Sequence, residues 1–476
     1  MSQINIIYNV EDKPSWGKTI VFALQQLLAI LAATIAVPAI INTGTDGAAE
    51  MSQAAALFGA GAGTLVYLLF TKFKSPVFLG SSFAFLGSMF AAFGGAISAS
   101  KGAIGLILGA VLAGLIYVII SLVVKFAGTK WIDKIMPAVV IGPTVAIIGL
   151  SLAGNAVSDM LKGATHVIDA SNNYYVMNWG GVASLVSGGA ALLGTILFSV
   201  YGKKLFKMIP FIFGILIGYV VALIFTGIGA ACKNPGMQIV NFSLFKEMQW
   251  LPDFTFVKAI KGFKEFSDAG DFFGYFGTIA VAYVPVAFVV FAEHLADHKN
   301  LSSIIQRDLL NEPGLNRTLL GDGVGSMAGA FFGGCPNTTY GESIGTVAIS
   351  GNASIRTIFV TACMAIVLSF IAPFSTFLAT IPSGVMGGVC VALYGFIAVS
   401  GLKMIKDVDL GENRNLFVVS TILILGVGSM QLVFGKVTLT KIAVALIAGI
   451  IINVLVRVLP FSKEEREAQE AKEEAK

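Results

Sequence analysis

The chain is poor in charge, in histidine and in paired cysteine, and each shortage excludes a class of protein. Only 12% of its 476 residues are charged, about half of the fraction usual in a soluble domain. The four cysteines stand far apart without a CxxC spacing, so neither a metal cluster nor a disulfide framework is expected. Three histidines and isolated cysteines also leave no nucleophile and base for an enzyme that acts on lipids. We therefore predict no catalytic centre, no metal and no cofactor.

Apolar residues are what the chain has in excess. Hydrophobic residues make up 56% of it and the mean hydropathy is +0.84, which predicts an integral membrane protein of many helices in the lipid bilayer. The first apolar run, Ile20 to Ile41, is too long for a signal peptide and has no cleavage site after it. The net charge of +4 reflects basic cytoplasmic loops, as in most membrane proteins, and not a nucleic-acid partner.

Fourteen segments are expected to span the membrane, each apolar over roughly 20 residues. Two of them, Pro76 to Ile97 and Cys335 to Ser350, are irregular. Each opens with a short stretch rich in β-branched, aromatic or small polar residues, which predicts extended chain ahead of an apolar helix. The twelve uninterrupted segments are 17–42, 53–71, 103–125, 135–154, 180–201, 206–231, 274–298, 316–333, 355–379, 382–402, 414–434 and 438–459.

The basic residues agree with this count. Cytoplasmic loops hold an excess of Lys and Arg, and most of the 31 fall in alternate loops, beginning with the N-terminal segment. Both termini are therefore expected in the cytoplasm, with the protein in the cell membrane. A long outer connection, 232–273, separates two halves of seven spans, 1–231 and 274–460, and a charged tail, 461–476, follows.

The irregular segments are the third and the tenth spans, the same place in each half. An odd number of spans per half turns the second half upside down relative to the first, so two inverted repeats are expected. Interrupted helices at corresponding positions of two repeats indicate the substrate site of a transporter. We expect that site between Ser81–Leu86 and Asn337–Glu342.

Two carboxylates, Glu293 and Glu342, lie in sequence that is otherwise lipid-soluble. An acid at membrane depth is costly and by default marks a substrate or proton site. The two broken helices begin nearby, where free backbone amides and the positive end of the helix dipole are available. Amide donors and carboxylate acceptors together suit a small, flat, neutral molecule, such as a pyrimidine or purine base. Phe83 and Tyr340 could supply faces for it to stack on.

Hydropathy alone leaves a second interpretation of Glu293 open. Together with His294, Asp297, His298 and Lys299 it could form the hydrated cytoplasmic end of the eighth span. Asp297 lies four residues after Glu293, on the same helix face, so it either joins a proton path or faces cytosolic water. His294 is expected to be a structural neighbour of the acids.

Three motifs resemble those of the uracil permeases in the nucleobase/ascorbate transporter family. They occur in the same order and spacing, and the similarity extends roughly from Ser15 to Pro460. The motifs are Leu79-Gly80-Ser81-Ser82-Phe83-Ala84-Phe85, Phe291-Ala292-Glu293-His294 and Pro336-Asn337-Thr338-Thr339-Tyr340-Gly341-Glu342.

The resemblance implies two inverted seven-span repeats arranged as two domains. Spans one to four and eight to eleven would form a core domain, and spans five to seven and twelve to fourteen a gate domain that often dimerises. By motif, Glu293 and Glu342 would hydrogen-bond the N–H groups of the base. The backbone amides of Phe83 and Gly341 would hold its carbonyls, and Tyr340 would pack against its ring.

The chain departs from this family pattern beside the expected site. Asp297 stands where uracil permeases often have His, and Gln25-Gln26 stands where they have Gln-His. After Glu342, the usual Asn-x-Gly-x4-Thr reads Ser343-Ile344-Gly345-x4-Ser350. The identity of the base and the path of the proton are the properties that these changes affect.

The expected function is import of a nucleobase, uracil first, by proton symport with alternating access. Glu293, with Asp297, is expected to carry the proton, because a carboxyl group held away from water favours its neutral form. A purine symporter for xanthine or urate on the same fold is the nearest alternative. Anion exchange is disfavoured because two acids repel anions, and a non-transporting membrane sensor stays open as a different class.

Overall fold

The protein is mostly helical. In the computed structural model, the described residues are 6–94, 97–128, 131, 137–168, 173–203, 206, 209–406, 408–434 and 437–458. Within them, eight helices are long and apolar enough to cross a membrane, or nine if one bent pair counts as a span. The charged tail expected at 461–476 lies outside the described residues.

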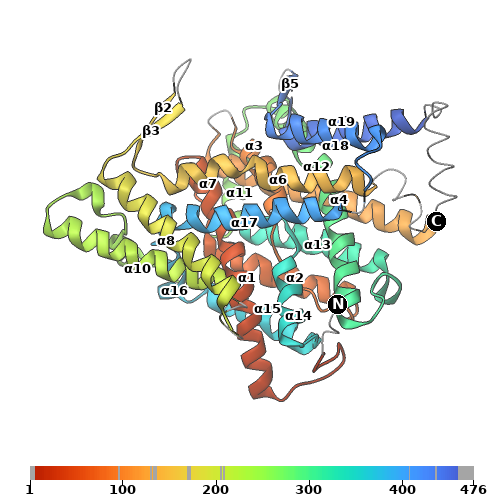
Figure 1. The fold of residues 1–476 in the computed structure, drawn as a ribbon, viewed down its shortest axis with the longest axis horizontal. Helices are drawn as coiled ribbons and strands as arrows, with labels where there is room; N and C mark the ends of the chain where they lie inside the picture. Colours follow the sequence, from red (N-terminus) through yellow and green to blue (C-terminus); the bar gives the residue numbers. More distant parts are fainter. Residues whose placement is uncertain are drawn as a thin grey trace.

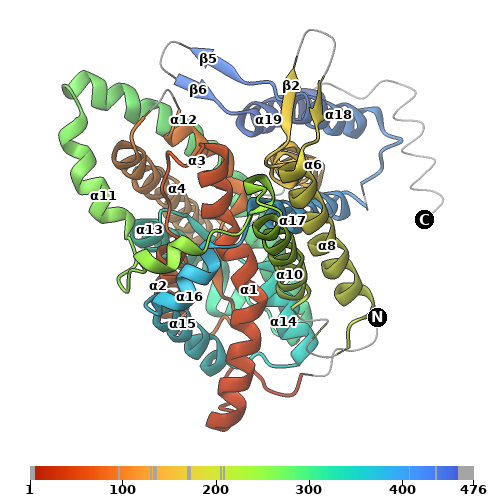
Figure 2. The same ribbon diagram turned by 90° about the vertical axis from the view of Figure 1, so that its left-hand side faces the viewer.

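The helices pack in two groups (Figure 1). We call the first the core group: α1 (Trp16–Gly44), α2 (Gln53–Phe70), α3 (Leu86–Ala92), α4 (Ala99–Ala127), α12 (Ala269–Ile305), α13 (Leu315–Gly333), α14 (Gly341–Ser350), α15 (Ile355–Ser369) and α16 (Ala372–Ala379). The second is the gate group: α6 (Ala138–Ser151), α7 (Ala153–Met160), α8 (Trp179–Tyr201), α10 (Pro210–Ala231), α17 (Ser383–Met404), α18 (Asn413–Val427) and α19 (Lys441–Val458). Figure 2 shows α1 between α2 and α15 of its own group and α8 and α10 of the other.

Helix ends follow local sequence signals. Side chains of Ser52, Ser98, Asn178 and Asp268 accept hydrogen bonds from first-turn amides of α2, α4, α8 and α12, which satisfies donors that a helix cannot pair internally. Gly334 ends α13 with a φ of 73°, a left-handed conformation that glycine adopts without a steric penalty.

Glycine lets the helices approach closely within each group. A Cβ on Gly59 of α2 would lie 2.5 Å from the carbonyl oxygen of Gly329 in α13, and one on Gly63 would lie 2.6 Å from that of Gly325. In the gate group, Gly388 of α17 meets the backbone of α8 in the same way. Small residues of this kind are typical of helix contacts in membranes, where packing replaces the hydrophobic effect.

Three short two-stranded sheets complete the fold of the described residues. Strand β1 (Leu79–Ser81) pairs with β4 (Asn337–Thr339), β2 (Thr165–Ile168) with β3 (Asn173–Val176), and β5 (Leu432–Phe434) with β6 (Val437–Leu439), all antiparallel. The long connection before α12 holds α11 (Thr255–Gly262), which packs on α4, and the 3-10 turns η2 (Pro235–Met237), η3 (Phe242–Glu247) and η4 (Phe263–Glu265). A π-turn, η5 (Leu310–Gly314), precedes α13.

The observed elements follow the expected segments with three differences. α15 and α16 meet at 82° instead of forming one span over 355–379, since Pro373 at the start of α16 cannot continue the preceding helix. α18 ends at Val427, before the expected residue 434, where Ser429 has a φ of 54°. Phe83–Phe85 forms a 3-10 turn, η1, and the extended residues come earlier, at Leu79–Ser81.

Candidate functional site

Two broken segments from opposite halves of the chain meet at β1 and β4. Leu79 pairs with Thr339, Gly80 with Thr338 and Ser81 with Asn337. All six residues are buried, and extended chain at membrane depth is tolerated only where its backbone groups find partners. Each strand therefore satisfies the other, and a helix begins directly after each, α3 through the η1 turn and α14 at Gly341.

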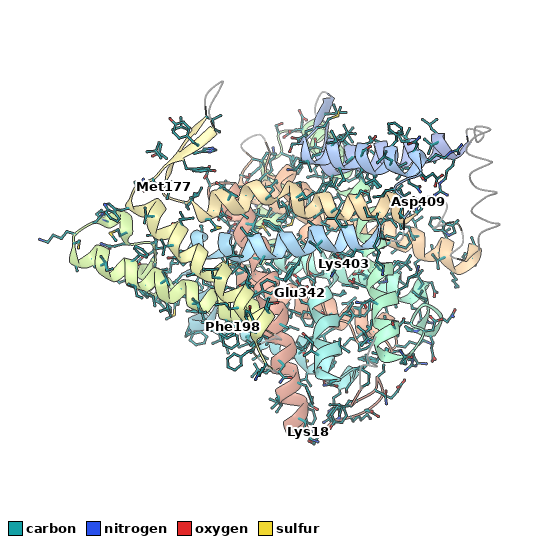
Figure 3. The ribbon with its side chains drawn as sticks, in the orientation of Figure 1. Lys18, Met177, Phe198, Glu342, Lys403 and Asp409 are labelled. Atoms are coloured by element: carbon teal, nitrogen blue, oxygen red, sulfur yellow. The ribbon has the colours of Figure 1, made fainter. Side chains whose placement is uncertain are left out.

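A cavity of about 400 Å³ lies where these two helices begin, a volume in the range usual for small-molecule sites. All the residues predicted for substrate binding and proton coupling line it, namely Phe83, Glu293, Asp297, Tyr340, Gly341 and Glu342. Figure 3 places Glu342 near the middle of the molecule, away from Lys18, Met177 and Asp409 at its edges.

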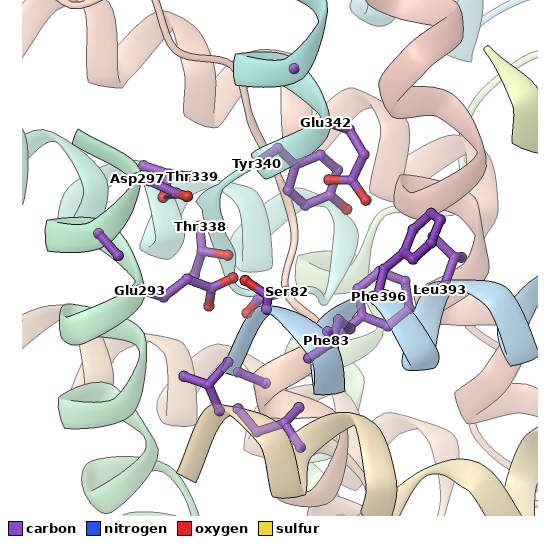
Figure 4. Close-up of a pocket in the computed structure, with 18 of the residues that line it drawn as sticks. Ser82, Phe83, Glu293, Asp297, Thr338, Thr339, Tyr340, Glu342, Leu393 and Phe396 are labelled. Carbon is purple, nitrogen blue, oxygen red and sulfur yellow. Dashed lines mark hydrogen bonds between the residues drawn. The ribbon is translucent and has the colours of Figure 1, made fainter. Parts of the chain in front are cut away.

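The two glutamates face this cavity from different elements (Figure 4). Glu293 projects from α12, and Glu342 from the first turn of α14. Both are half-buried, and within the described chain neither carboxylate accepts a side-chain hydrogen bond. They are therefore acceptors available to a ligand. The first-turn amides of α14, beginning with Gly341, are donors that the helix itself leaves unpaired.

Asp297 is already engaged. The hydroxyl of Thr339, in β4, donates a hydrogen bond of 2.6 Å to Asp297 Oδ2. Asp297 thus lines the cavity one helical turn from Glu293 and ties α12 to the strand that carries the site. At this position Asp297 can hold β4 in place through Thr339, or it can carry a proton.

Tyr340 and Phe83 differ in how firmly they are held. The Tyr340 hydroxyl donates a 2.7 Å hydrogen bond to the carbonyl of Ser81, and its ring lies against Gly80 so closely that a Cβ there would collide with it. Tyr340 is consequently a fixed wall of the cavity. Phe83 is half-buried and meets the ring of Tyr394, in α17, edge-on, with the ring centroids 6.1 Å apart.

A buried polar cluster lies behind Glu293, on the histidine face of α12. His294 Nδ1 is 2.7 Å from Asp322 Oδ2, and His294 Nε2 is 3.0 Å from the Thr318 hydroxyl. His298 Nε2 is 2.8 Å from the hydroxyl of Tyr67. Both histidines are 0% exposed, so this part of α12 is not a hydrated helix end.

Two departures from the family pattern turn out to be one contact. Gln26 Nε2, in α1, donates a 2.5 Å hydrogen bond to Ser343 Oγ, in α14. The backbone N–H of Phe78 donates to the same oxygen at 3.2 Å. Both side chains are buried and lie behind the cavity wall, so they reach a substrate only through the helices that they join.

Sequence reasoning missed two sets of site residues. Asp322 is an acid inside the expected span 316–333, so the cost of burying charge could have identified it. The gate side of the cavity carried no such signal, because apart from Ser400 its residues are ordinary apolar ones: Val145, Ile148, Pro210, Phe211, Leu393, Phe396, Ile397 and Met404.

The residues also bear on metal binding. Within the described part of the chain, no group of three or more His, Cys, Asp or Glu side chains is arranged to hold a metal ion.

Comparison with known proteins gives one consistent result. A family model described as "Permease family" matches residues 17–435. A uracil permease from Bacillus subtilis (strain 168) is 36% identical over 470 residues, which cover 98% of each chain, and one from Bacillus caldolyticus is 34% identical over 96% of each. The transmembrane domain of the cyanobacterial bicarbonate transporter BicA matches in fold, with a TM-score of 0.58 and 14% identity over 92% of this chain and 98% of that one.

Proposed function

The chain belongs to the permease family whose model covers residues 17–435, and on that premise we propose that it imports a nucleobase, uracil first, by proton symport. The observation that supports this most directly is the pair Glu293 and Glu342 facing one cavity beside the start of α14. Two carboxylate acceptors and a row of amide donors complement the alternating N–H and C=O groups of a neutral base. Both Bacillus relatives are uracil permeases by name, so uracil is the first base to test.

The membrane topology forms part of this proposal. Added to the eight long helices of the described chain, the two broken spans, the bent pair and the helices α13, α18 and α19 would make fourteen segments in two inverted seven-span repeats, 1–231 and 274–460, with both termini in the cytoplasm. The core group corresponds to a core domain and the gate group to a gate domain. Apolar side chains exposed on α8 and α10, such as Leu197 and Ile224, are suited to lipid or to a second copy of the chain.

The direction in which the cavity leads supports alternating access. Its lining continues along α14 to Ile349 and along α17 to Met404, and in the proposed topology these helix ends are cytoplasmic. On the opposite side, Phe83 and Tyr394 are in contact across the two groups. The structure is therefore inward-facing in this scheme, and rocking of the gate group against the core group would open the outer path.

Proton coupling is assigned to Glu293, assisted by Asp297. Removing an acid from water favours its protonated form, so Glu293 would take up a proton together with the base outside. It would release the proton when the cavity opens to the more alkaline cytosol. Asp297 lies one turn away on the same cavity wall.

The experiment is uptake of labelled uracil into proteoliposomes with an imposed inward proton gradient. We expect accumulation by the wild type and a loss of about 100-fold or more in Glu293→Gln and Glu342→Gln, because glutamine replaces a charged acceptor with a weaker neutral one and cannot carry a proton. Asp46→Asn is the matched control, since this carboxylate is 94% exposed at the surface. Failure of the wild type to take up uracil, with uptake of xanthine or urate in its place, would redirect the assignment to a purine.

A further inference from the structure

A second, much smaller cavity lies behind the substrate cavity. Thr338 lines both, and the other walls of the small cavity include Phe85, Tyr117, Asp322 and Asn337. Its free volume is about 10 Å³, close to the roughly 10–15 Å³ that one water molecule needs. It has room for a single small guest.

Three polar atoms on its walls have no hydrogen-bond partner in the described chain. They are Asp322 Oδ1, Asn337 Oδ1 and the hydroxyl of Tyr117. Their side chains are 1%, 1% and 4% exposed, and they come from α13, β4 and α4. Buried polar groups are nearly always satisfied in folded proteins, so three unsatisfied atoms around one cavity indicate a guest that satisfies them.

The other polar atoms of Asp322 and Asn337 are already hydrogen-bonded. The atoms left unpaired therefore determine which donors and acceptors a guest must supply. Asp322 Oδ2 is occupied by His294 at 2.7 Å, and Asn337 Nδ2 donates to the carbonyl of Gly59 at 3.0 Å. The atoms that these three lining residues leave unpaired are therefore two acceptor oxygens and one hydroxyl donor, that of Tyr117. A water molecule donates two hydrogen bonds and accepts others, and this is the complement of that set.

We propose that this cavity binds one water molecule, which donates to Asp322 and Asn337 and accepts from Tyr117. A sodium ion fits the two oxygens as well, but it would leave the tyrosine hydrogen without an acceptor in the described chain. The water joins α4, α13 and β4 at one point. Because Asn337 directly precedes Thr338 and Thr339, which line the substrate cavity, Tyr117 is a positioning residue that holds this strand from behind.

The first test is Tyr117→Phe, which removes only the hydroxyl. Tyr283→Phe is a matched control, because Tyr283 is 0% exposed, has an equally unpartnered hydroxyl and does not line the small cavity. In Tyr117→Phe we expect the KM for labelled uracil to rise about three- to tenfold with little change in maximal rate, the size of one lost hydrogen bond. The control should stay within about twofold of wild type. Equal effects of the two variants would overturn the positioning role.

A second test does not depend on transport and so separates this inference from the proposed function. Thermal midpoints in detergent are measured for Tyr117→Phe, Asp322→Asn and the double variant, with Tyr283→Phe replacing Tyr117→Phe in a control cycle. Groups that share one water should be non-additive, whereas the control pair should add. High-resolution density of the wild type should show a peak within hydrogen-bonding distance of the three oxygens. Additive midpoints, an empty cavity, or stabilisation by Na⁺ over K⁺ at equal ionic strength would each overturn the water assignment.

Discussion

The two walls of the substrate cavity are chemically unlike each other. The core group supplies Glu293, Asp297, Glu342 and the polar strand residues, whereas the gate group supplies almost only apolar side chains, with Ser400 as the polar residue. Hydrogen bonds are directional and short, while apolar contact tolerates sliding. A substrate held by the core wall alone can stay bound while the gate wall moves past it.

The walls also differ in how they are supported. Behind the core wall, Thr339 is bonded to Asp297, Tyr340 to Ser81 and Gln26 to Ser343. On the gate wall the side chains are apolar except for that of Ser400, so hydrogen bonds fix almost none of their positions. Substitutions in the core wall should therefore alter substrate recognition and proton coupling. Substitutions in the gate wall should alter only how closely the wall packs against the substrate.

The largest effect is expected from a methyl group behind the core wall. In Gly80→Ala the new Cβ collides with the ring of Tyr340 and displaces the residue that precedes α14. Because a misplacement of about 1 Å can cost about 100-fold in rate, we expect uptake to fall by at least that factor. Gly87→Ala is the control, since a Cβ there meets nothing within 4 Å. Normal uptake by Gly80→Ala would show that the core wall is not rigid.

A smaller but more selective effect is expected at Asp297. Asparagine keeps an acceptor for the Thr339 hydroxyl but cannot carry a proton at this position. In Asp297→Asn we expect exchange of labelled for unlabelled uracil to persist, while accumulation driven by a proton gradient falls about tenfold. This is less than the roughly 100- to 10,000-fold typical of a lost proton-transfer group, because Glu293 is retained. Accumulation equal to that of the wild type would leave Glu293 as the sole proton carrier.

A substitution in the gate wall should have a different effect from the two substitutions in the core group. Phe396→Ala removes apolar contact area, which is worth about 25 cal/mol per Å², and we expect the KM for uracil to rise about fivefold. The enlarged cavity should also admit purines, so competition by xanthine should appear. Phe396→Leu, which keeps most of the contact area, is the control. Complete loss of transport in Phe396→Ala would contradict the idea that the core wall binds the substrate by hydrogen bonds and the gate wall adds only apolar contact.

The same contrast explains what the sequence could predict. Interruptions in otherwise apolar segments indicated β1 and β4, and the cost of burying charge indicated Glu293 and Glu342. The identical argument applies to Asp322, which sequence reasoning passed over. The gate wall could not be found in this way, because Leu393 or Phe396 looks like any side chain that faces lipid.

Contacts between residues far apart in the sequence could not be predicted either. Gln26 and Ser343 are 317 residues apart, and each appeared separately as a departure from the family pattern. In the folded chain α1 packs against α14, the helix that follows β4. A pattern read along one chain has no means of showing that two unusual residues compensate each other.

The smallest effect is expected from breaking that contact. In Gln26→Ala, Ser343 keeps the hydrogen bond from the Phe78 amide, so we expect a loss of about 1 kcal/mol in stability and a KM for uracil within about twofold of wild type. Ser343→Ala alone should cost more, since it also leaves that amide unpaired, and the two changes should be non-additive in thermal unfolding. If Gln26→Ala instead changes which base is carried, the contact sets specificity through α14, and recognition extends beyond the side chains that touch the base.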